Sequence, residues 1–305
     1  MAKKNKKNID VPAGMSRRQA KLAARAAERA ALTVDPRPFH TTGCECDLIA
    51  MREFVASASF DITVDGETVR VCTILPGAVS AHRLPAESDG LRMVGIQSPQ
   101  PSNNPARDLA AAIHWVLDAA PGDVLQHATA TADTPNLSTY IPADFTPDIT
   151  VYDDFNWWVP DTDNLNPQVA QSLNAANDAM MVSRRLTATT GAAWWIDTRE
   201  KAHVRWVRPE NEDDLFTALV RVHAAGHLTL GEGSRYAGMF RAYGVLVPVF
   251  DVDRTQPAEY WQDALDTLGT KLDVALATSD PLTASERNSR NLLNSRPVSY
   301  THLTL

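Results

Sequence analysis

Residues 60–71 read FDITVDGETVRV, and the prediction of the fold starts from this stretch. Apolar and polar residues alternate from Phe60 to Val64 and again from Val69 to Val71, as the side chains of half-buried strands do. Asp65-Gly66 lies between the two runs and is a residue pair preferred in two-residue hairpin turns. The stretch therefore predicts an antiparallel β-hairpin.

Helix caps and further apolar runs mark the elements around this hairpin. Asn104 followed by proline predicts a helix start, and Pro121-Gly122 ends that helix. Asn166 and Asn211 are the expected N-caps of two more helices, and residues 283–286 have capping-box spacing before the last helix. The other expected strands span residues 91–97, 193–196, 203–207 and 245–250.

These elements predict an α+β fold with two halves, each made of a sheet and helices. Strand, strand and helix follow one another in both halves, which suggests a diverged duplication. We place a basic helical arm at residues 1–38, an N-terminal segment at 39–145 and a C-terminal segment at 146–296. Residues 297–305 end in SYTHLTL, which resembles a translated sequencing adapter, and we exclude them as an artefact. The alternative is a native β-prone tail.

Charge is unevenly distributed along the chain. Residues 1–30 hold nine Lys or Arg and two acidic residues, a net charge of +7, whereas the rest of the chain has a net charge of −15. A basic arm on an acidic body favours a contact between the arm and a polyanion such as nucleic acid. The alternative is a solvated tail without a partner. Ser16 and Gln19 have capping-box spacing and predict a helix in the arm to about Leu32.

Composition excludes several classes of protein. With 44% hydrophobic and 22% charged residues, the chain is neither wholly disordered nor collagenous. Every apolar run is well short of the roughly 18 residues of a membrane-spanning helix. Three cysteines are too few for a disulfide framework, and no apolar secretory stretch follows the basic start. We therefore expect a soluble, cytoplasmic protein without a membrane partner.

The common catalytic motifs, including the Walker A loop, G-x-S-x-G and H-E-x-x-H, are absent from the sequence. The best metal candidate combines His40 with Cys44, Cys46 and Asp47, because thiolates and imidazole bind zinc, and Cys72 is the available further ligand. The C-x-C spacing is tighter than that of usual zinc sites, so we favour buried structural cysteines. We therefore predict no metal and no cofactor.

The best candidate for a ligand site begins at two glycines. They precede a predicted helix over residues 233–243, and the N–H groups at a helix start bind anions. An arginine fork beside them would add charge. The residues predicted to bind a phosphate or carboxylate are Gly231, Gly233, Ser234, Arg235, Tyr236 and Arg241. The alternative is a tight turn without a ligand, and Glu232 would repel an anion there.

Several motifs together carry a family resemblance. They are Glu45-Cys46-Asp47, MREFV at 51–55, ARDLAAA at 106–112, VRWV at 204–207, the long block from Gly231 to Asp251, PLTA at 281–284, and Ser295-Arg296. In these the chain resembles an uncharacterised actinobacterial family defined as a domain of unknown function, over Phe39 to Arg296. Cys44 lies outside the family pattern, which further weakens a metal site.

The resemblance implies little chemistry. Some members of the family carry the labels topoisomerase II or preprotein translocase SecA, but this chain lacks a P-loop and is too short for either enzyme. We expect a non-catalytic binding or adaptor protein whose basic arm contacts a polyanion. Two alternatives stay open: an enzyme with a site around Gly231–Arg241, and a structural subunit of a larger assembly with a protein partner.

Overall fold

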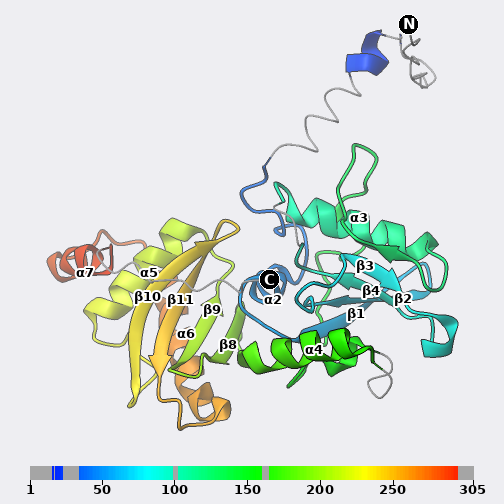
Figure 1. Ribbon diagram of the computed structural model, residues 1–305. Coiled ribbons are helices and arrows are strands. Elements are labelled where there is room, and N and C mark those ends of the chain that lie inside the picture. Colours follow the sequence, from blue (N-terminus) through cyan, green and yellow to red (C-terminus); the bar gives the residue numbers. More distant parts are fainter. Residues whose placement is uncertain (1–15, 17, 23–33, 99–101, 160–164, 295–305) are drawn as a thin grey trace, which may run out of the picture.

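The structure is a computed structural model, and it describes residues 16, 18–22, 34–98, 102–159 and 165–294. The body consists of two sheets that lie side by side with helices between and around them (Figure 1). The described elements confirm the α+β class. No helix within the described residues is long and apolar enough to cross a membrane.

The first sheet is mixed and has the strand order β5-β3-β4-β2-β1-β6. The predicted hairpin is confirmed: β1 and β2 pair from Ser59–Cys72 to Val64–Glu67, and Asp65 and Gly66 form the turn with φ of 52° and 83°. β2 pairs in parallel with β4, and the other pairs are antiparallel. The strands are β1 (Ala58–Val64), β2 (Glu67–Cys72), β3 (Ala81–Arg83), β4 (Arg92–Gly95), β5 (Val124–Leu125) and β6 (Thr150–Val151).

The second sheet is antiparallel throughout, with the order β10-β11-β9-β8-β7. The two sheets therefore differ in strand order and in strand direction, so the halves do not repeat one topology. The strands are β7 (Val182–Leu186), β8 (Ala192–Asp197), β9 (Ala202–Val207), β10 (Ser234–Ala242) and β11 (Val245–Val252).

Helices cover both faces of each sheet. α3 and α4 lie on opposite faces of the first sheet, and α2 lies between the two sheets, where it packs against β8 and β9 (Figure 1). α5 and α6 cover the outer face of the second sheet, and α7 packs on α5. The helices are α2 (Glu45–Glu53), α3 (Pro105–Asp118), α4 (Pro167–Ala179), α5 (Glu212–Ala224), α6 (Gln262–Leu276) and α7 (Ala284–Asn294).

The predicted caps of these helices are confirmed. The side chains of Asn104, Asn166 and Asn211 each accept a backbone N–H in the first turn of α3, α4 and α5. Thr283 and Glu286 form the reciprocal capping box of α7. In the arm, Ser16 and Gln19 form the same box before the helical residues 18–22, and the rest of the predicted arm helix lies outside the described residues.

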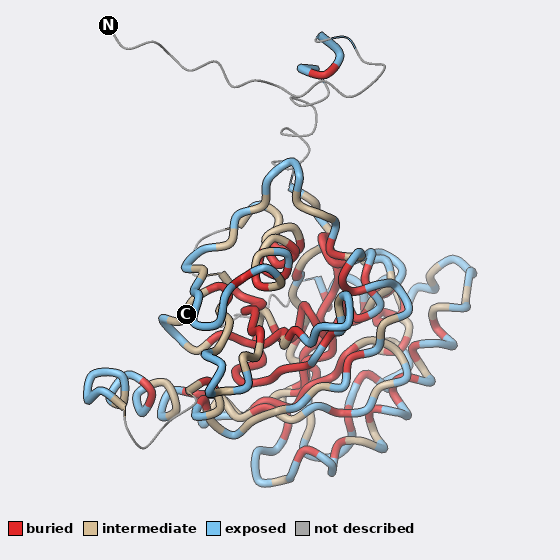
Figure 2. The backbone as a smooth tube through the Cα atoms, turned by 90° about the vertical axis from the view of Figure 1, so that its right-hand side faces the viewer, coloured by how far each residue is buried: buried red, intermediate tan, exposed pale blue. Residues whose placement is uncertain are grey.

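The buried residues form a nearly continuous band through the body (Figure 2). One core cluster joins α2, α3 and the first sheet to Trp194 and Ile196 on the inner face of β8. The neighbouring residues Ala193 and Trp195 face the second cluster, under α5 and α6. Because successive strand residues face opposite sides, β8 contributes to two cores at once.

The first sheet extends past residue 145, where we place the segment boundary. β6 pairs with β1, and Leu173 of α4 packs with Cys72 and Met93 of the first sheet. Residues 295–305, which include the whole predicted artefact tail, lie outside the described residues.

One predicted element is wrong. Residues 233–243 are not a helix: β10 runs from Ser234 to Ala242 and pairs with β11 through a turn at Tyr243-Gly244. These two turn residues have φ of 47° and 78°, the same left-handed pair as in the first hairpin. A tyrosine in place of asparagine or aspartate hides the turn in the sequence. Gly238 sits at a bulge of this pairing, where its φ is 139°.

Candidate functional site

The predicted anion loop is a tight turn that leads into β10. Gly231 and Gly233 have φ of 89° and 76°, a left-handed conformation that favours glycine. The Ser234 hydroxyl accepts the Leu230 N–H at 2.8 Å and donates to the Gly231 carbonyl at 2.7 Å. Ser234 therefore holds the turn together. The helix start on which the predicted anion site rested is not present at this turn.

The other residues of the predicted anion site lie far apart along β10. The Tyr236 ring is buried and packs edge-on against Phe250, with ring centroids 5.5 Å apart. Arg235 pairs with Asp251 at 2.5 Å, and Arg241 pairs with Glu212. The two arginines are six residues apart on one strand, a separation of about 20 Å. The structure brings Gly233, Ser234 and Arg235 together but leaves Arg241 at the other end of the strand.

A surface hollow of about 510 Å³ lies at the Arg235 end of β10. Its charged lining residues balance one another: Lys201, Arg235 and Arg254 against Glu200, Asp251 and Asp253. Arg254 is also paired with Asp197 at 2.7 Å. An anion therefore meets no net positive field in this hollow.

A row of charged side chains crosses three strands beside the hollow. His203 of β9, Asp251 of β11 and Arg235 of β10 are register partners, and His203 Nδ1 lies 3.0 Å from Asp251 Oδ1. Burial lowers the pKa of His203, and the positive charge of Arg205 lowers it further. Asp251 thus lies between an imidazole on one side and a guanidinium on the other. Only the strand pairing brings these residues together.

The structure does not assemble the metal candidate. His40 is exposed, whereas Cys44 and Cys46 are buried at the start of α2. Burial raises the pKa of Cys44 to about 12, and burial also raises the pKa of Cys46. Cys72 lies in a different cluster. Across the described part of the chain, no three His, Cys, Asp or Glu side chains gather closely enough to hold a metal ion.

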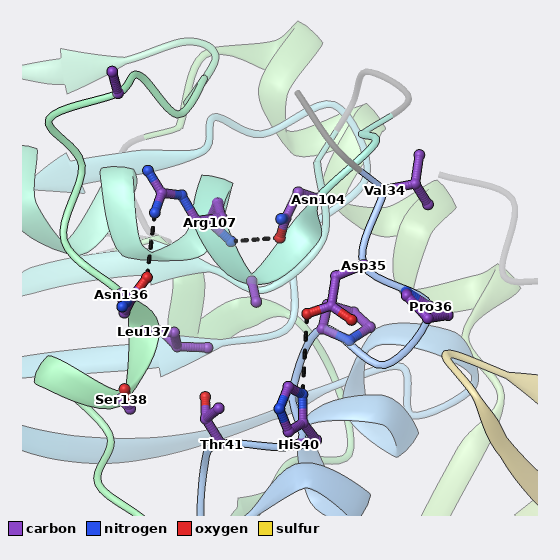
Figure 3. Close-up of a pocket in the computed structure, with 13 residues that line it drawn as sticks. Val34, Asp35, Pro36, His40, Thr41, Asn104, Arg107, Asn136, Leu137 and Ser138 are labelled. Atoms are coloured by element: carbon purple, nitrogen blue, oxygen red, sulfur yellow. Dashed lines mark hydrogen bonds and ion pairs between the residues drawn. The ribbon is translucent and has the colours of Figure 1, made fainter. Parts of the chain in front are cut away.

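A groove lies on the surface of the body at the end of the basic arm. It has a volume of about 720 Å³, and we call it the arm groove (Figure 3). One wall is residues 34–41, which are the end of the arm and the first residues after it. The other wall is the start of α3, together with the loop that leads into the short helix Leu137–Thr139 and the start of that helix. Its lining residues are Val34, Asp35, Pro36, Pro38, His40, Thr41, Asn104, Ala106, Arg107, Ala132, Asn136, Leu137 and Ser138.

Arg107 organises the α3 wall of the arm groove. Its Nη1 donates to Asn136 Oδ1 at 3.2 Å, and its Nη2 donates to the Thr131 carbonyl at 2.8 Å. Asn104 Oδ1 accepts the Arg107 N–H at 3.2 Å as the cap of α3. Figure 3 shows the contacts of Arg107 with Asn104 and Asn136 along one side of the groove. The sequence indicates Asn104 as a cap, but it does not indicate Arg107 or Asn136.

The opposite wall is anchored to both halves of the body. Arg37 donates to Glu45 of α2 at 2.7 Å and to the Pro209 carbonyl, which follows β9, at 2.6 Å. Phe39 is fully buried and meets the Tyr243 ring with centroids 5.5 Å apart. Residues 37–39, where the arm ends, are therefore anchored to the body on this side of the groove.

Comparison with known proteins identifies a family for the chain. A model described as "Family of unknown function (DUF5926)" matches residues 38–301. No curated protein and no solved structure matches the chain.

Proposed function

Since the chain belongs to this family of unknown function, we propose from its charges and its arm groove that it is a non-catalytic binding protein whose basic arm contacts a polyanion, with nucleic acid as the partner. The observation that carries the proposal is the separation of charge. Nine of the 29 Lys and Arg residues lie in the first 30 positions, and the rest of the chain has a net charge of −15.

The acidic body limits where a polyanion makes contact. A body with this net charge repels nucleic acid at long range, so attraction comes from the arm. The arm joins the body at the arm groove, where Arg107 is the basic residue of the facing wall. A long polyanion that binds the arm is therefore tethered to the same side of the body as the groove.

The salt dependence of binding tests the proposal. A labelled single-stranded RNA of twenty nucleotides is titrated with the full chain between 50 and 200 mM salt, and fluorescence anisotropy gives the Kd. Each arm residue that neutralises a phosphate adds about 0.7 to the slope of log Kd against log salt for a single strand. We expect Lys6→Gln/Lys7→Gln to reduce that slope by about 1.4.

A matched variant controls for net charge. Lys201→Gln/Lys271→Gln also removes two lysine charges, but from the body, and we expect the slope to stay at its wild-type value. If the slope of log Kd against log salt fell equally in the two double variants, the arm would have no special role. Binding that does not change with salt would contradict a polyanion contact altogether.

A further inference from the structure

The α3 wall of the arm groove presents hydrogen-bond donors. Asn104 Oδ1 is used by the helix cap and Asn136 Oδ1 is used by Arg107, so each amide keeps its NH₂ group for another partner. Within the described residues, neither NH₂ group has a partner. Arg107 adds a guanidinium, which only donates. This wall therefore matches a ligand rich in acceptor oxygens, such as a phosphate.

The opposite wall carries an apolar set, Val34, Pro36 and Pro38, beside the polar residues Asp35, His40 and Thr41. Val34 is 62% exposed, and Pro36 and Pro38 line the groove together with it. Figure 3 shows Val34 and Pro36 on this side of the groove. Ligand sites combine apolar walls with a few polar groups that fix orientation, and their volumes run from about 300 to 1,000 Å³. A ligand that fills the groove has an anionic side and a flat apolar side. A nucleotide has both, whereas inorganic polyphosphate has only the first.

One carboxylate lies in the groove and opposes anion binding. Asp35 accepts the Arg37 N–H at 2.9 Å, and its other oxygen is 4.0 Å from His40 Nδ1. His40 Nδ1 is 2.6 Å from the Arg37 carbonyl, so this nitrogen carries the proton. Asp35 is thus turned to its own chain segment and lies on the wall opposite Arg107.

We infer that the arm groove binds one or two nucleotides of a single-stranded nucleic acid, with a phosphate at Asn104, Arg107 and Asn136 and a sugar or base against Val34, Pro36 and Pro38. The inference rests on the proposed function, because the arm contacts the neighbouring phosphates of the same strand. A single strand fits because its bases are unstacked and its flat faces are available for contact.

A pair of matched substitutions tests the site in the full chain. Asn104→Asp keeps a capping oxygen for α3 but replaces the NH₂ donor by an anionic oxygen in the groove. Asn166→Asp makes the same change at the cap of α4, outside the groove. Both variants add one negative charge, and we expect them to unfold at the same temperature as each other. The probe is the labelled RNA of twenty nucleotides at 50 mM salt.

We expect Asn104→Asp to weaken RNA binding about tenfold and Asn166→Asp to change the Kd less than twofold. Arg107→Gln should lower the salt slope by about 0.7, as the loss of one phosphate contact does. Equal Kd values for the two aspartate variants would overturn the groove site while leaving arm binding intact. A wild-type chain that fails to bind RNA at 50 mM salt would overturn both.

Inorganic polyphosphate distinguishes the nucleotide from a general phosphate ligand. We expect Asn104→Asp to weaken polyphosphate binding much less than RNA binding, by no more than about twofold relative to Asn166→Asp, because polyphosphate has no sugar or base to hold it in the groove. A tenfold loss for polyphosphate as well would overturn the nucleotide assignment. Val34→Asn gives the complementary result: it should weaken binding of the RNA two- to threefold and leave polyphosphate unchanged.

Discussion

Arg185 on β7 holds the carboxylate of Asp47 at the start of α2 through two hydrogen bonds, Nε to Oδ1 at 3.0 Å and Nη2 to Oδ2 at 3.1 Å. The partners are 138 residues apart, and the pair fastens α2 to the second sheet. The two side chains differ in exposure, 10% for Asp47 and 37% for Arg185. Burial raises the pKa of Asp47, and the charge of Arg185 opposes this rise.

This difference predicts unequal effects of removing the two partners. Arg185→Met leaves the buried carboxylate of Asp47 without its partner, and we expect a loss of about 3 kcal/mol of unfolding free energy. Asp47→Asn leaves a guanidinium that water can reach, and we expect a loss of about 1 kcal/mol or less. Urea denaturation of both variants measures the two losses. The exposed pair Arg70–Asp61 is the control, and Arg70→Met should cost less than about 1 kcal/mol. Equal losses from Arg185→Met and Asp47→Asn would contradict this account.

Two glycines with a left-handed backbone differ in the space around their Cβ positions. Gly191 precedes β8 with φ of 79°, and a Cβ there would lie 2.1 Å from the Val207 carbonyl oxygen. Gly122 has φ of 92° but open space around its Cβ position. We expect Gly122→Ala to cost about 1–2 kcal/mol from the left-handed backbone alone. Gly191→Ala should cost at least about 3 kcal/mol, because the backbone of β9 must also move. Thermal unfolding measures the loss of unfolding free energy in each variant. Equal losses would refute the steric argument.

The sequence predicts the parts of the fold that are encoded locally. The first hairpin and the caps of α3, α4, α5 and α7 depend on residues within a few positions of one another, so their side-chain types are sufficient. β10 depends on pairing with β11, and its Tyr243-Gly244 turn lacks the asparagine or aspartate that marks such turns. Its arginines and glycines therefore fit a helix pattern equally well.

The arm groove could not be predicted for a different reason. Its walls come from residues 34–41, the start of α3 and residues 132–138, which the fold brings together from three parts of the chain. Asn104 is recognisable as a cap, but its remaining NH₂ group becomes a ligand donor only because Arg107 and Asn136 line the same wall. The charge of the arm, by contrast, is a property of composition and needs no structure.

The cysteines give a prediction about reactivity. Cys44, Cys46 and Cys72 are all buried, and burial raises the pKa of each thiol. Only the thiolate reacts, so the native protein at pH 8 should show no thiol that reacts rapidly with Ellman's reagent. In guanidinium chloride three thiols should react. A rapidly reacting thiol in the native protein would show that the start of α2, or the Cys72 site, opens in solution.

His82 predicts how stability changes with pH. Its ring stacks on Trp158 with centroids 5.7 Å apart, and burial lowers its pKa below the ordinary value of 6.5. Below pH 6.5 the unfolded chain therefore binds a proton more readily than the folded protein does. The contribution of His82 to stability is complete above pH 6.5 and is lost as the pH falls toward the folded pKa, by at most about 1.4 kcal/mol per pH unit.

The variant His82→Phe isolates this effect, because phenylalanine keeps a ring against Trp158 and does not titrate. Between pH 5 and pH 7 we expect its unfolding free energy in urea to rise less steeply with pH than that of the wild type. His203 also has a lowered pKa, so it still contributes to the pH dependence of the unfolding free energy in this variant. The double variant His82→Phe/His203→Gln should be flatter still. An unchanged slope in His82→Phe would show that the folded protein protonates His82 as readily as the unfolded chain does.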